Sequence, residues 1–320
     1  MHLPIPCRTS ILLSADRVFR WKKIPLTAAG PSLSRLVWGT WRLLAQPDIR
    51  DPKPLAAFID QCLHLGITSF DLADLYGGFG VEEVFGHGLQ AWAGDRSAIQ
   101  LVSKCGIRPV TSARPDNRVK HYDSSRDHIL RSVTNSLRAL HTEYLDLLLI
   151  HRPDPLMDAD ETAEALQEVM AKGWVRHVGV SNHSPRQFSL LQSRLPVPLA
   201  TNQVEYSILH PNALEEGSFD QMQKLRRAPM LWSPLGGGAL FTDPAYAALR
   251  AALATVGEKL GHADIGTTAL AWALTHPSRP VAVVGTGQID RLAGYRAALT
   301  GLERQDWFAL LEAARGQPVA

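Results

Sequence analysis

Four side chains in the first half of the sequence have the chemistry to hold and move a proton: Asp71, Tyr76, Lys104 and His151. A lysine beside a buried aspartate keeps its positive charge, and a charged lysine close to a phenol lowers the pKa of the tyrosine from its ordinary value of about 10. We therefore expect Tyr76 to be a proton donor whose pKa is lowered by Lys104, with Asp71 as the partner of that lysine.

Taken one at a time, these residues have ordinary structural explanations. Asp71 could cap a turn, Lys104 could lie in a solvated loop, and His151 could be a satisfied histidine of the core. Their positions favour a shared site, because these three end apolar runs and Tyr76 follows Asp71 within the stretch SFDLADLYGGFG. The glycines of that stretch permit a tight bend that would return Tyr76 over the strand ends. Asp74, in the same stretch, is predicted to be a loop or capping residue without a direct chemical role.

The elements that must position these residues follow a regular alternation. Eight apolar runs recur, each followed by a turn and by a longer segment with the apolar spacing of a helix. The runs cover residues 35–40, 67–72, 99–104, 145–151, 175–181, 199–204, 229–234 and 281–286. Eight strand–helix repeats predict an α/β protein with a single (β/α)8 TIM barrel, whose active site lies at the carboxyl ends of its strands.

A doubly wound open sheet is the alternative fold for this alternation. Such a sheet normally carries a glycine-rich dinucleotide loop after its first strand, and the segment RLVWGTWRLL (35–44) has no such loop. The helix signals fit either fold: residues 52–66 end on a glycine, residues 124–142 begin with serines, and residues 158–173 carry acidic residues in their first turn. The missing loop favours the barrel.

The composition is that of a globular protein, with 45% hydrophobic and 20% charged residues. A formal net charge of +2 gives no indication of a nucleic-acid or membrane-surface partner. No apolar run reaches the roughly 18 residues needed to span a bilayer. Cys7, Cys62 and Cys105 form neither a disulfide framework nor a paired metal motif, so we expect a reducing compartment and a cytoplasmic protein.

The sequence predicts one domain preceded by a short extension. No low-complexity linker or shift in composition divides the chain, and we expect residues 24–320 to form the barrel. Residues 1–23 are predicted to be a loose N-terminal extension. They lack the basic start and the cleavage site of a secretory signal.

The order of the motifs resembles that of the aldo/keto reductase family, over nearly the whole chain from about residue 24. FDLADLYGG, VSKCG and DLLLIHRPD are similar to the family's catalytic segments, and GVSNHS, TNQVEYS and WSPLGGG to its cofactor segments. The resemblance implies that Tyr76 is the general acid in the reduction of a small aldehyde or ketone. It implies that Lys104 and Asp71 tune this acid and that His151 orients the carbonyl. The segment LIHRPDPLMDADE most resembles the sequences of a bacterial subgroup of predicted oxidoreductases.

The same resemblance implies NADPH or NADP+ as the cofactor, with NADH less favoured. Hydride would come from the nicotinamide, because no side chain can supply it. Arg291 matches a position near the adenosine phosphate, and a guanidinium can make paired contacts with a 2′-phosphate. Gly285, however, stands where several members of the family carry a lysine, which weakens the preference for NADPH.

The cofactor residues implied by the resemblance fall at four of the predicted strand ends and in two glycine-containing loops. An amide group needs both donors and acceptors to fix its plane, which suits the three polar residues matched to the carboxamide, Ser181, Asn182 and Gln203. Trp232 matches the ring that stacks on the nicotinamide. The full expected set is Gly39, Thr40, Trp41, Ser181, Asn182, Gln203, Trp232, Ser233, Pro234, Leu235, Gly236, Gly238, Gly285, Thr286, Gly287 and Arg291.

The substrate pocket is less well defined by the sequence. Trp41 and the loops after Tyr76 and His151 are expected to form its wall. We interpret Arg152 as a structural residue that pairs with Asp154 at the base of its loop.

Two functions of other classes compete with the reductase. A nicotinamide-binding sensor or accessory subunit would need no turnover, but every catalytic position of the family is filled in this sequence. A metal-dependent barrel hydrolase needs histidines and carboxylates clustered at strand ends, and only Asp71 and His151 qualify, so no metal is expected.

Overall fold

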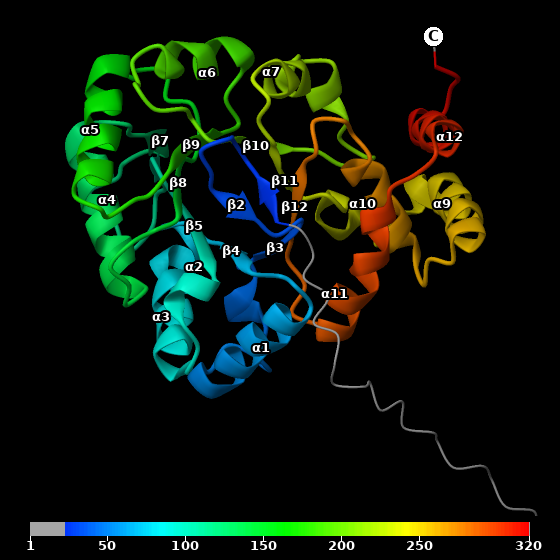
Figure 1. Ribbon diagram of the computed structural model, residues 1–320, viewed down its shortest axis with the longest axis horizontal. Coiled ribbons are helices and arrows are strands. Elements are labelled where there is room, and N and C mark those ends of the chain that lie inside the picture. Colours follow the sequence, from blue (N-terminus) through cyan, green and yellow to red (C-terminus); the bar gives the residue numbers. More distant parts are fainter. Residues whose placement is uncertain (1–22, 320) are drawn as a thin grey trace, which may run out of the picture.

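A ring of eight parallel strands surrounded by helices dominates the computed structural model, which describes residues 23–319 (Figure 1). The strands follow the order β10-β11-β12-β3-β4-β5-β8-β9 and close on themselves, which confirms the TIM barrel. Each strand lies within its predicted run or extends one residue beyond it. The strands are β3 (Leu36–Gly39), β4 (Ser69–Asp71), β5 (Gln100–Cys105), β8 (Leu147–Ile150), β9 (Val178–Ser181), β10 (Asn202–Glu205), β11 (Met230–Trp232) and β12 (Val281–Val284).

Helices follow the strands and cover the outside of the ring (Figure 1). Their apolar faces pack with side chains of the strands in two clusters, of which the second includes α9, α10 and α12 with β10 and β11. The helices are α1 (Pro52–His64), α2 (Tyr76–Phe79), α3 (Val81–Ala91), α4 (Arg126–Ala139), α5 (Ala159–Ala171), α6 (Pro185–Gln192), α7 (Ser218–Lys224), α8 (Ala239–Thr242), α9 (Ala247–Leu260), α10 (Ile265–Leu274), α11 (Ile289–Tyr295) and α12 (Arg304–Arg315).

The helix boundaries reflect local capping chemistry. The Ser125 side chain accepts a hydrogen bond from the backbone N–H of His128 at the start of α4, and the Asp158 side chain accepts two at the start of α5. After α1 the chain turns through Gly66, whose φ of 76° lies in the left-handed region that favours glycine. The three helices expected from the sequence therefore begin and end close to where the signals place them.

One end of the barrel is closed by a hairpin. Its two strands, β1 (Ile24–Pro25) and β2 (Ser32–Leu33), pair antiparallel and lie across the ring in Figure 1. Leu26 and Leu33 are fully buried and belong to the same apolar cluster as Val102 and Leu147 inside the barrel. Because apolar side chains fill this end, a ligand site of the barrel must lie at the other.

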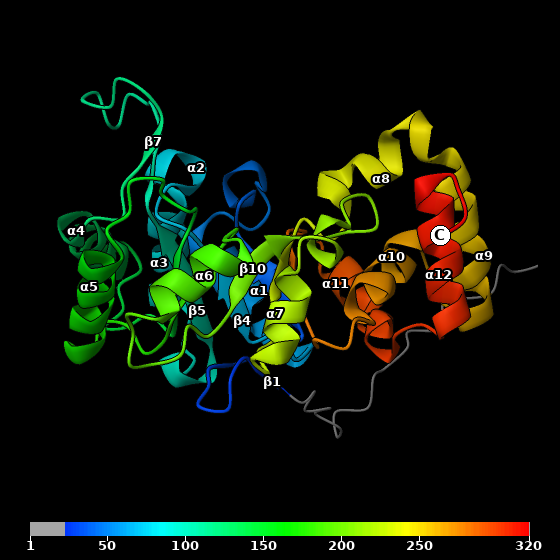
Figure 2. The ribbon, with the colours of Figure 1, turned by 90° about the horizontal axis from the view of Figure 1, so that it is seen from above.

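The opposite end carries the loops that follow the carboxyl ends of the strands. Figure 2 shows α2, α8 and β7 at this end and β1 at the other. β7 (His121–Tyr122) pairs with β6 (Ile107–Arg108) in a second small hairpin. Within residues 23–319, no helix is long and apolar enough to cross a membrane. The predicted extension over residues 1–23 lies outside the described part of the chain, except for Lys23.

Candidate active site

Lys104 lies at the centre of a buried polar cluster at the carboxyl end of the barrel. Its Nζ donates hydrogen bonds to Asp71 Oδ2 at 2.6 Å, to the Leu72 carbonyl oxygen at 2.7 Å and to Tyr76 Oη at 2.9 Å. The Lys104 side chain has no solvent exposure. Burial by itself lowers the pKa of this lysine, but the combined effect of Asp71 and Tyr76 raises it above its ordinary value, so Lys104 stays charged.

Asp71 is held from both sides. Its Oδ1 accepts a hydrogen bond of 2.7 Å from Nε2 of Gln203, and its Oδ2 accepts the one from Lys104. The backbone carbonyl of Asp71 accepts hydrogen bonds from the backbone N–H and from the hydroxyl of Thr40, both at 3.0 Å. All four residues are buried, so neither carboxylate oxygen needs a water partner.

Tyr76 stays protonated over the neutral pH range. Burial raises its pKa, and the nearby Lys104 charge, which acts in the opposite direction, does not reverse the shift. The sequence-based expectation of a lowered pKa is therefore wrong for this cluster, because it counted the lysine and omitted the desolvation of the phenolate. A neutral phenol is the form that a proton donor requires.

His151 faces the tyrosine ring and carries no charge. Its ring centre lies 5.9 Å from that of Tyr76, in an edge-to-face arrangement. Burial, followed by the charges of Lys104 and Arg152, holds the pKa of His151 well below its ordinary value. Nδ1 of His151 is buried without a hydrogen-bond partner among the described residues. A neutral imidazole can both donate and accept a hydrogen bond.

These residues open into a cavity of about 820 Å³, within the range of ligand and cofactor sites. Asp71, Tyr76 and His151 line it, and Lys104 lies behind them. Of the residues predicted to contact a cofactor, most also line it: Gly39, Trp41, Ser181, Asn182, Gln203, Trp232, Ser233, Pro234, Leu235, Gly238, Gly285, Thr286, Gly287 and Arg291.

Two predicted cofactor residues do not line the cavity. Thr40 is fully buried and supports the backbone of Asp71 instead. Gly236 donates its N–H to the Ser233 carbonyl oxygen at 2.8 Å, and a Cβ at Gly236 would lie 2.6 Å from Leu209. Both residues therefore support the cavity wall without lining it.

Hydrogen bonds link Ser181, Asn182 and Trp232 at the cavity wall. Asn182 Nδ2 donates to Ser181 Oγ at 2.7 Å, and Asn182 Oδ1 accepts a hydrogen bond of 2.9 Å from Trp232 Nε1. Asn182 and Ser233 adopt positive φ values of 61° and 51°, which are uncommon for residues other than glycine. Such backbone strain is typical of functional sites, where the surrounding structure holds it in place.

The far end of the cavity is formed by the loop after β12. Trp38 Nε1 donates to the Thr286 carbonyl oxygen at 2.9 Å and fixes this loop to the barrel. At Gly287, an ideal Cβ would lie 1.6 Å from Gln46 Oε1, so a larger residue there would have to displace the end of the Gln46 side chain. Arg291 is exposed, lines the cavity and makes no ion pair with the described residues. Its free guanidinium fits the phosphate end of an NADP-type cofactor.

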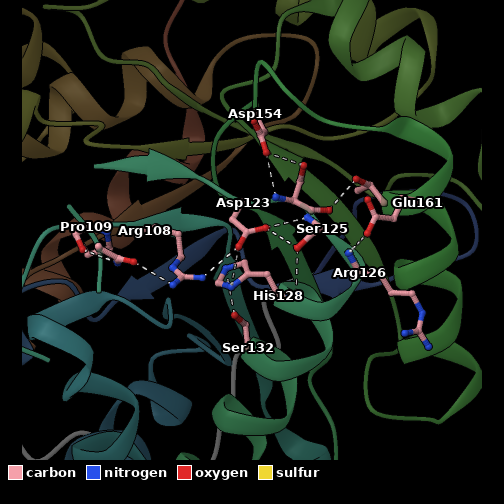
Figure 3. A network of polar contacts seen from close by, with 12 residues as sticks. Arg108, Pro109, Asp123, Ser125, Arg126, His128, Ser132, Asp154 and Glu161 are labelled. Atoms are coloured by element: carbon pink, nitrogen blue, oxygen red, sulfur yellow. Dashed lines mark hydrogen bonds and ion pairs between the residues drawn. The ribbon is translucent and has the colours of Figure 1, made fainter. Parts of the chain in front are cut away.

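Arg152 differs from its predicted role. It makes no ion pair with Asp154, whose carboxylate instead accepts hydrogen bonds from the backbone and hydroxyl of Ser124 and from the backbone N–H of Leu156. Figure 3 shows Asp154 within a polar network that includes Asp123. Arg152 lines the main cavity, so the interpretation as a structural ion pair is wrong.

The segment between β3 and α1 also lines the cavity, although it was not predicted from the sequence to do so. Its residues 45–49 line the main cavity next to the loop after β12. No charged or glycine-rich motif marks this segment, and only its position after the first barrel strand could have indicated it. Phe241 of α8, at the rim, was missed for the same reason.

A second cavity, of about 780 Å³, lies behind the loop that carries Tyr76. Asp74 and Phe79 line it, and the backbone N–H of Asp74 donates to the Lys104 carbonyl oxygen at 3.0 Å. Oδ1 of Asp74 is enclosed without a hydrogen-bond partner among the described residues, and burial, with a smaller effect of Glu82, raises the pKa of Asp74 to about 8. No group of three or more His, Cys, Asp or Glu residues in the described range could hold a metal ion.

The fold and the main cavity define the class of the protein, a barrel oxidoreductase that uses a nicotinamide cofactor. The chain belongs to the aldo/keto reductase family, whose model matches residues 35–314.

Two relatives and one solved structure illustrate this membership. Oxidoreductase YdhF of Escherichia coli is 47% identical over 299 residues, which cover 93% of this chain and 99% of the relative. The 6-dehydroglucose reductase of Agrobacterium fabrum is 46% identical and covers 90% of this chain and 96% of its own. The structure of an aldo/keto reductase from Klebsiella pneumoniae, in complex with NADP and acetate, is 25% identical with a TM-score of 0.73, over 94% of this chain and 98% of the other.

Proposed function

We propose that the protein reduces aldehydes or ketones to alcohols with NADPH, with Tyr76 as the general acid. The observation that carries this proposal is the position of Lys104 Nζ, which donates hydrogen bonds to both Asp71 and Tyr76 at the wall of the cavity. The lysine charge favours the phenolate that remains once Tyr76 has given its proton to the carbonyl oxygen. Asp71 keeps that charge in place.

His151 is proposed to orient the substrate. Its imidazole is neutral and adjoins Tyr76, so it can donate a hydrogen bond to the carbonyl oxygen without competing as an acid. The bound cofactor supplies the hydride. The residues matched to its carboxamide, Ser181, Asn182 and Gln203, are proposed to fix the ring, with Trp232 stacked on it.

The preference for NADPH over NADH is proposed on the basis of Arg291. Its guanidinium lines the far end of the cavity and makes no ion pair within residues 23–319. An adenosine 2′-phosphate would provide an anionic partner through charge-assisted hydrogen bonds. We expect Arg291→Ala to raise the KM for NADPH by about 10-fold or more and to leave the KM for NADH nearly unchanged. An equal effect on both cofactors would contradict this role.

Sugar-derived aldehydes are the first substrates that we propose to test. Two relatives, 46% and 36% identical to this chain, are named 6-dehydroglucose reductase. Trp41, which is 59% exposed and packs its ring edge-to-face with Tyr76 at 4.8 Å between ring centres, offers an aromatic surface of the kind on which a sugar ring can lie.

The decisive experiment follows the loss of NADPH absorbance with a panel of aldehydes and ketones. Wild type should consume NADPH, and Tyr76→Phe should lower kcat by about 100- to 10,000-fold because it removes the hydroxyl that donates the proton and keeps the ring. Tyr122→Phe, which alters a tyrosine away from the cavity, is the matched control. Equal inactivity of wild type and Tyr76→Phe across the panel would overturn the proposal.

A further inference from the structure

Arg152 places a positive charge in the main cavity, and no carboxylate of the described residues pairs with it. It follows His151 directly, lines the cavity, and makes no hydrogen bond or ion pair with any described residue. Its guanidinium carbon lies 5.5 Å from the ring centre of Trp232, within the range of a cation–π contact. The neighbouring carboxylate of Asp154, the natural candidate for its partner, is occupied by Ser124.

The other cations around the cavity already have a role in the structure or in the proposed cofactor site. Lys104 is neutralised by Asp71, and Arg42 donates a hydrogen bond of 2.8 Å to the Gly237 carbonyl oxygen. Arg291 stands at the far end, near the loop after β12. Arg152 is therefore the one cation on the described cavity wall whose charge is close to the proposed proton donor and still unassigned.

The guanidinium of Arg152 lies near Tyr76 and His151, the groups proposed to act on the carbonyl. Arg152 directly follows His151 in the chain and lines the same cavity as His151 and Tyr76, whose ring centres lie 5.9 Å apart. A cation–π contact occupies one face of a guanidinium and leaves the N–H donors around its edge free. The Trp232 ring thus holds the group in place while its donors stay available to a ligand.

We propose that Arg152 binds an anionic group of the substrate, so that the enzyme prefers carbonyl compounds that carry a carboxylate or a similar oxyanion. This inference rests on the proposed reductase function and names its substrate class. The planar fork of the guanidinium matches two carboxylate oxygens, and the partly enclosed cavity strengthens the contact relative to water. Arg152 acts as a specificity residue, while Tyr76 and His151 remain responsible for the chemistry.

A pair of matched aldehydes tests the proposal. 4-Formylbenzoate and 4-formylbenzamide have nearly the same shape, and only the first carries a negative charge. We expect wild type to have a kcat/KM about 10- to 100-fold higher for the benzoate, the effect of one charge-assisted contact. Arg152→Gln should abolish most of that ratio, chiefly by raising KM for the benzoate, and should leave kcat/KM for the benzamide within about threefold.

Arg42→Gln is the control, since it removes the same charge from the same cavity wall at a residue with another partner. It should leave the ratio between the two aldehydes unchanged. Calorimetric binding of benzoate and of benzamide to the enzyme saturated with NADP+ gives a second reading that needs no turnover. The benzoate should bind more tightly, and Arg152→Gln should remove the difference.

The outcomes separate the two proposals. If wild type reduces both aldehydes with equal kcat/KM, or if Arg152→Gln keeps the preference, the role of Arg152 is overturned and the reductase function stands. If Arg152→Gln raises the KM for NADPH and leaves the ratio unchanged, Arg152 serves the cofactor and the proposal is wrong. If wild type reduces no aldehyde or ketone at all, the proposed function fails and this inference fails with it.

Discussion

Gln203 donates a hydrogen bond of 2.7 Å to Asp71 although 132 residues separate them in the chain. Gln203 belongs to β10 and Asp71 to β4, and these strands lie four places apart in the ring of eight, on opposite sides of the barrel. The contact therefore crosses the barrel and joins a proposed cofactor residue to the partner of Lys104. A substitution of Gln203 should therefore affect Asp71, and a substitution of Asp71 should affect Gln203.

Gln203→Leu should weaken both the fold and the reaction. The substitution leaves Asp71 Oδ1 buried without a donor, which costs about 1 to 3 kcal/mol in the free energy of unfolding and loosens the partner of Lys104. Urea denaturation and kcat measure the two effects. Thr201→Val is the control, since it removes a buried hydrogen bond of 2.8 Å to the Ala228 carbonyl oxygen on the same segment. It should reduce stability and leave kcat unchanged; a loss of kcat in both variants would argue against a specific link.

Lys104→Met should destabilise the protein by about 3 to 5 kcal/mol, because it leaves the Asp71 carboxylate buried and uncompensated. Adding Asp71→Asn to that variant should restore part of the loss, since the remaining group is then neutral. Chemical denaturation of the two single variants and the double variant measures this as a coupling free energy. A double variant as unstable as the sum of the single ones would show that the two charges do not depend on each other.

The rate of carbonyl reduction should not change between pH 6 and pH 9. Tyr76 keeps its proton in this range because burial raises its pKa, and His151 is neutral because burial and Lys104 lower its pKa. The measurement is kcat/KM for an aldehyde at saturating NADPH, which reports the groups of the enzyme before the substrate binds. A fall in rate with a midpoint below pH 9 would mean that Lys104 outweighs the desolvation of Tyr76, as the sequence alone led us to expect.

Asp74→Asn should remove a loss of stability that wild type shows as the pH rises. The pKa of Asp74 is about 8 in the folded protein against an ordinary value of 3.8, so the unfolded chain releases this proton first. The free energy of unfolding of wild type should therefore decrease from about pH 4 to about pH 8, and that of the Asn variant should decrease by several kcal/mol less. Urea denaturation at several pH values measures the difference. Glu83→Gln, at an exposed neighbour, is the control and should match wild type.

The barrel could be predicted from the sequence because its signals are local. Each strand has three to six residues and lies within a predicted run or extends one residue beyond it, and the N-caps Ser125 and Asp158 set the starts of α4 and α5. The ends of the strands then place Asp71, Lys104 and His151 on one rim, which depends only on the strands being parallel. Lys104 and Asp71 do meet there, at 2.6 Å.

The parts that could not be predicted depend on contacts between distant segments and on burial. Nothing in the sequence near Asp154 indicates that Ser124 rather than Arg152 occupies its carboxylate. The direction of the Tyr76 pKa shift depends on the depth of the site, because the same lysine lowers the pKa less than burial raises it. Such balances require the three-dimensional arrangement, since sequence spacing alone gives no measure of desolvation.

The hydrogen bond between Gln203 of β10 and Asp71 of β4 also means that only a completely folded chain has the whole site. A fragment of the chain that ends before β10 would hold Asp71, Tyr76, Lys104 and His151 but would lack Gln203, and the remaining fragment would lack the other four. Neither half alone can assemble the site. The activity regained on mixing two such fragments would measure the fraction of molecules in which both fragments have associated and the barrel has closed.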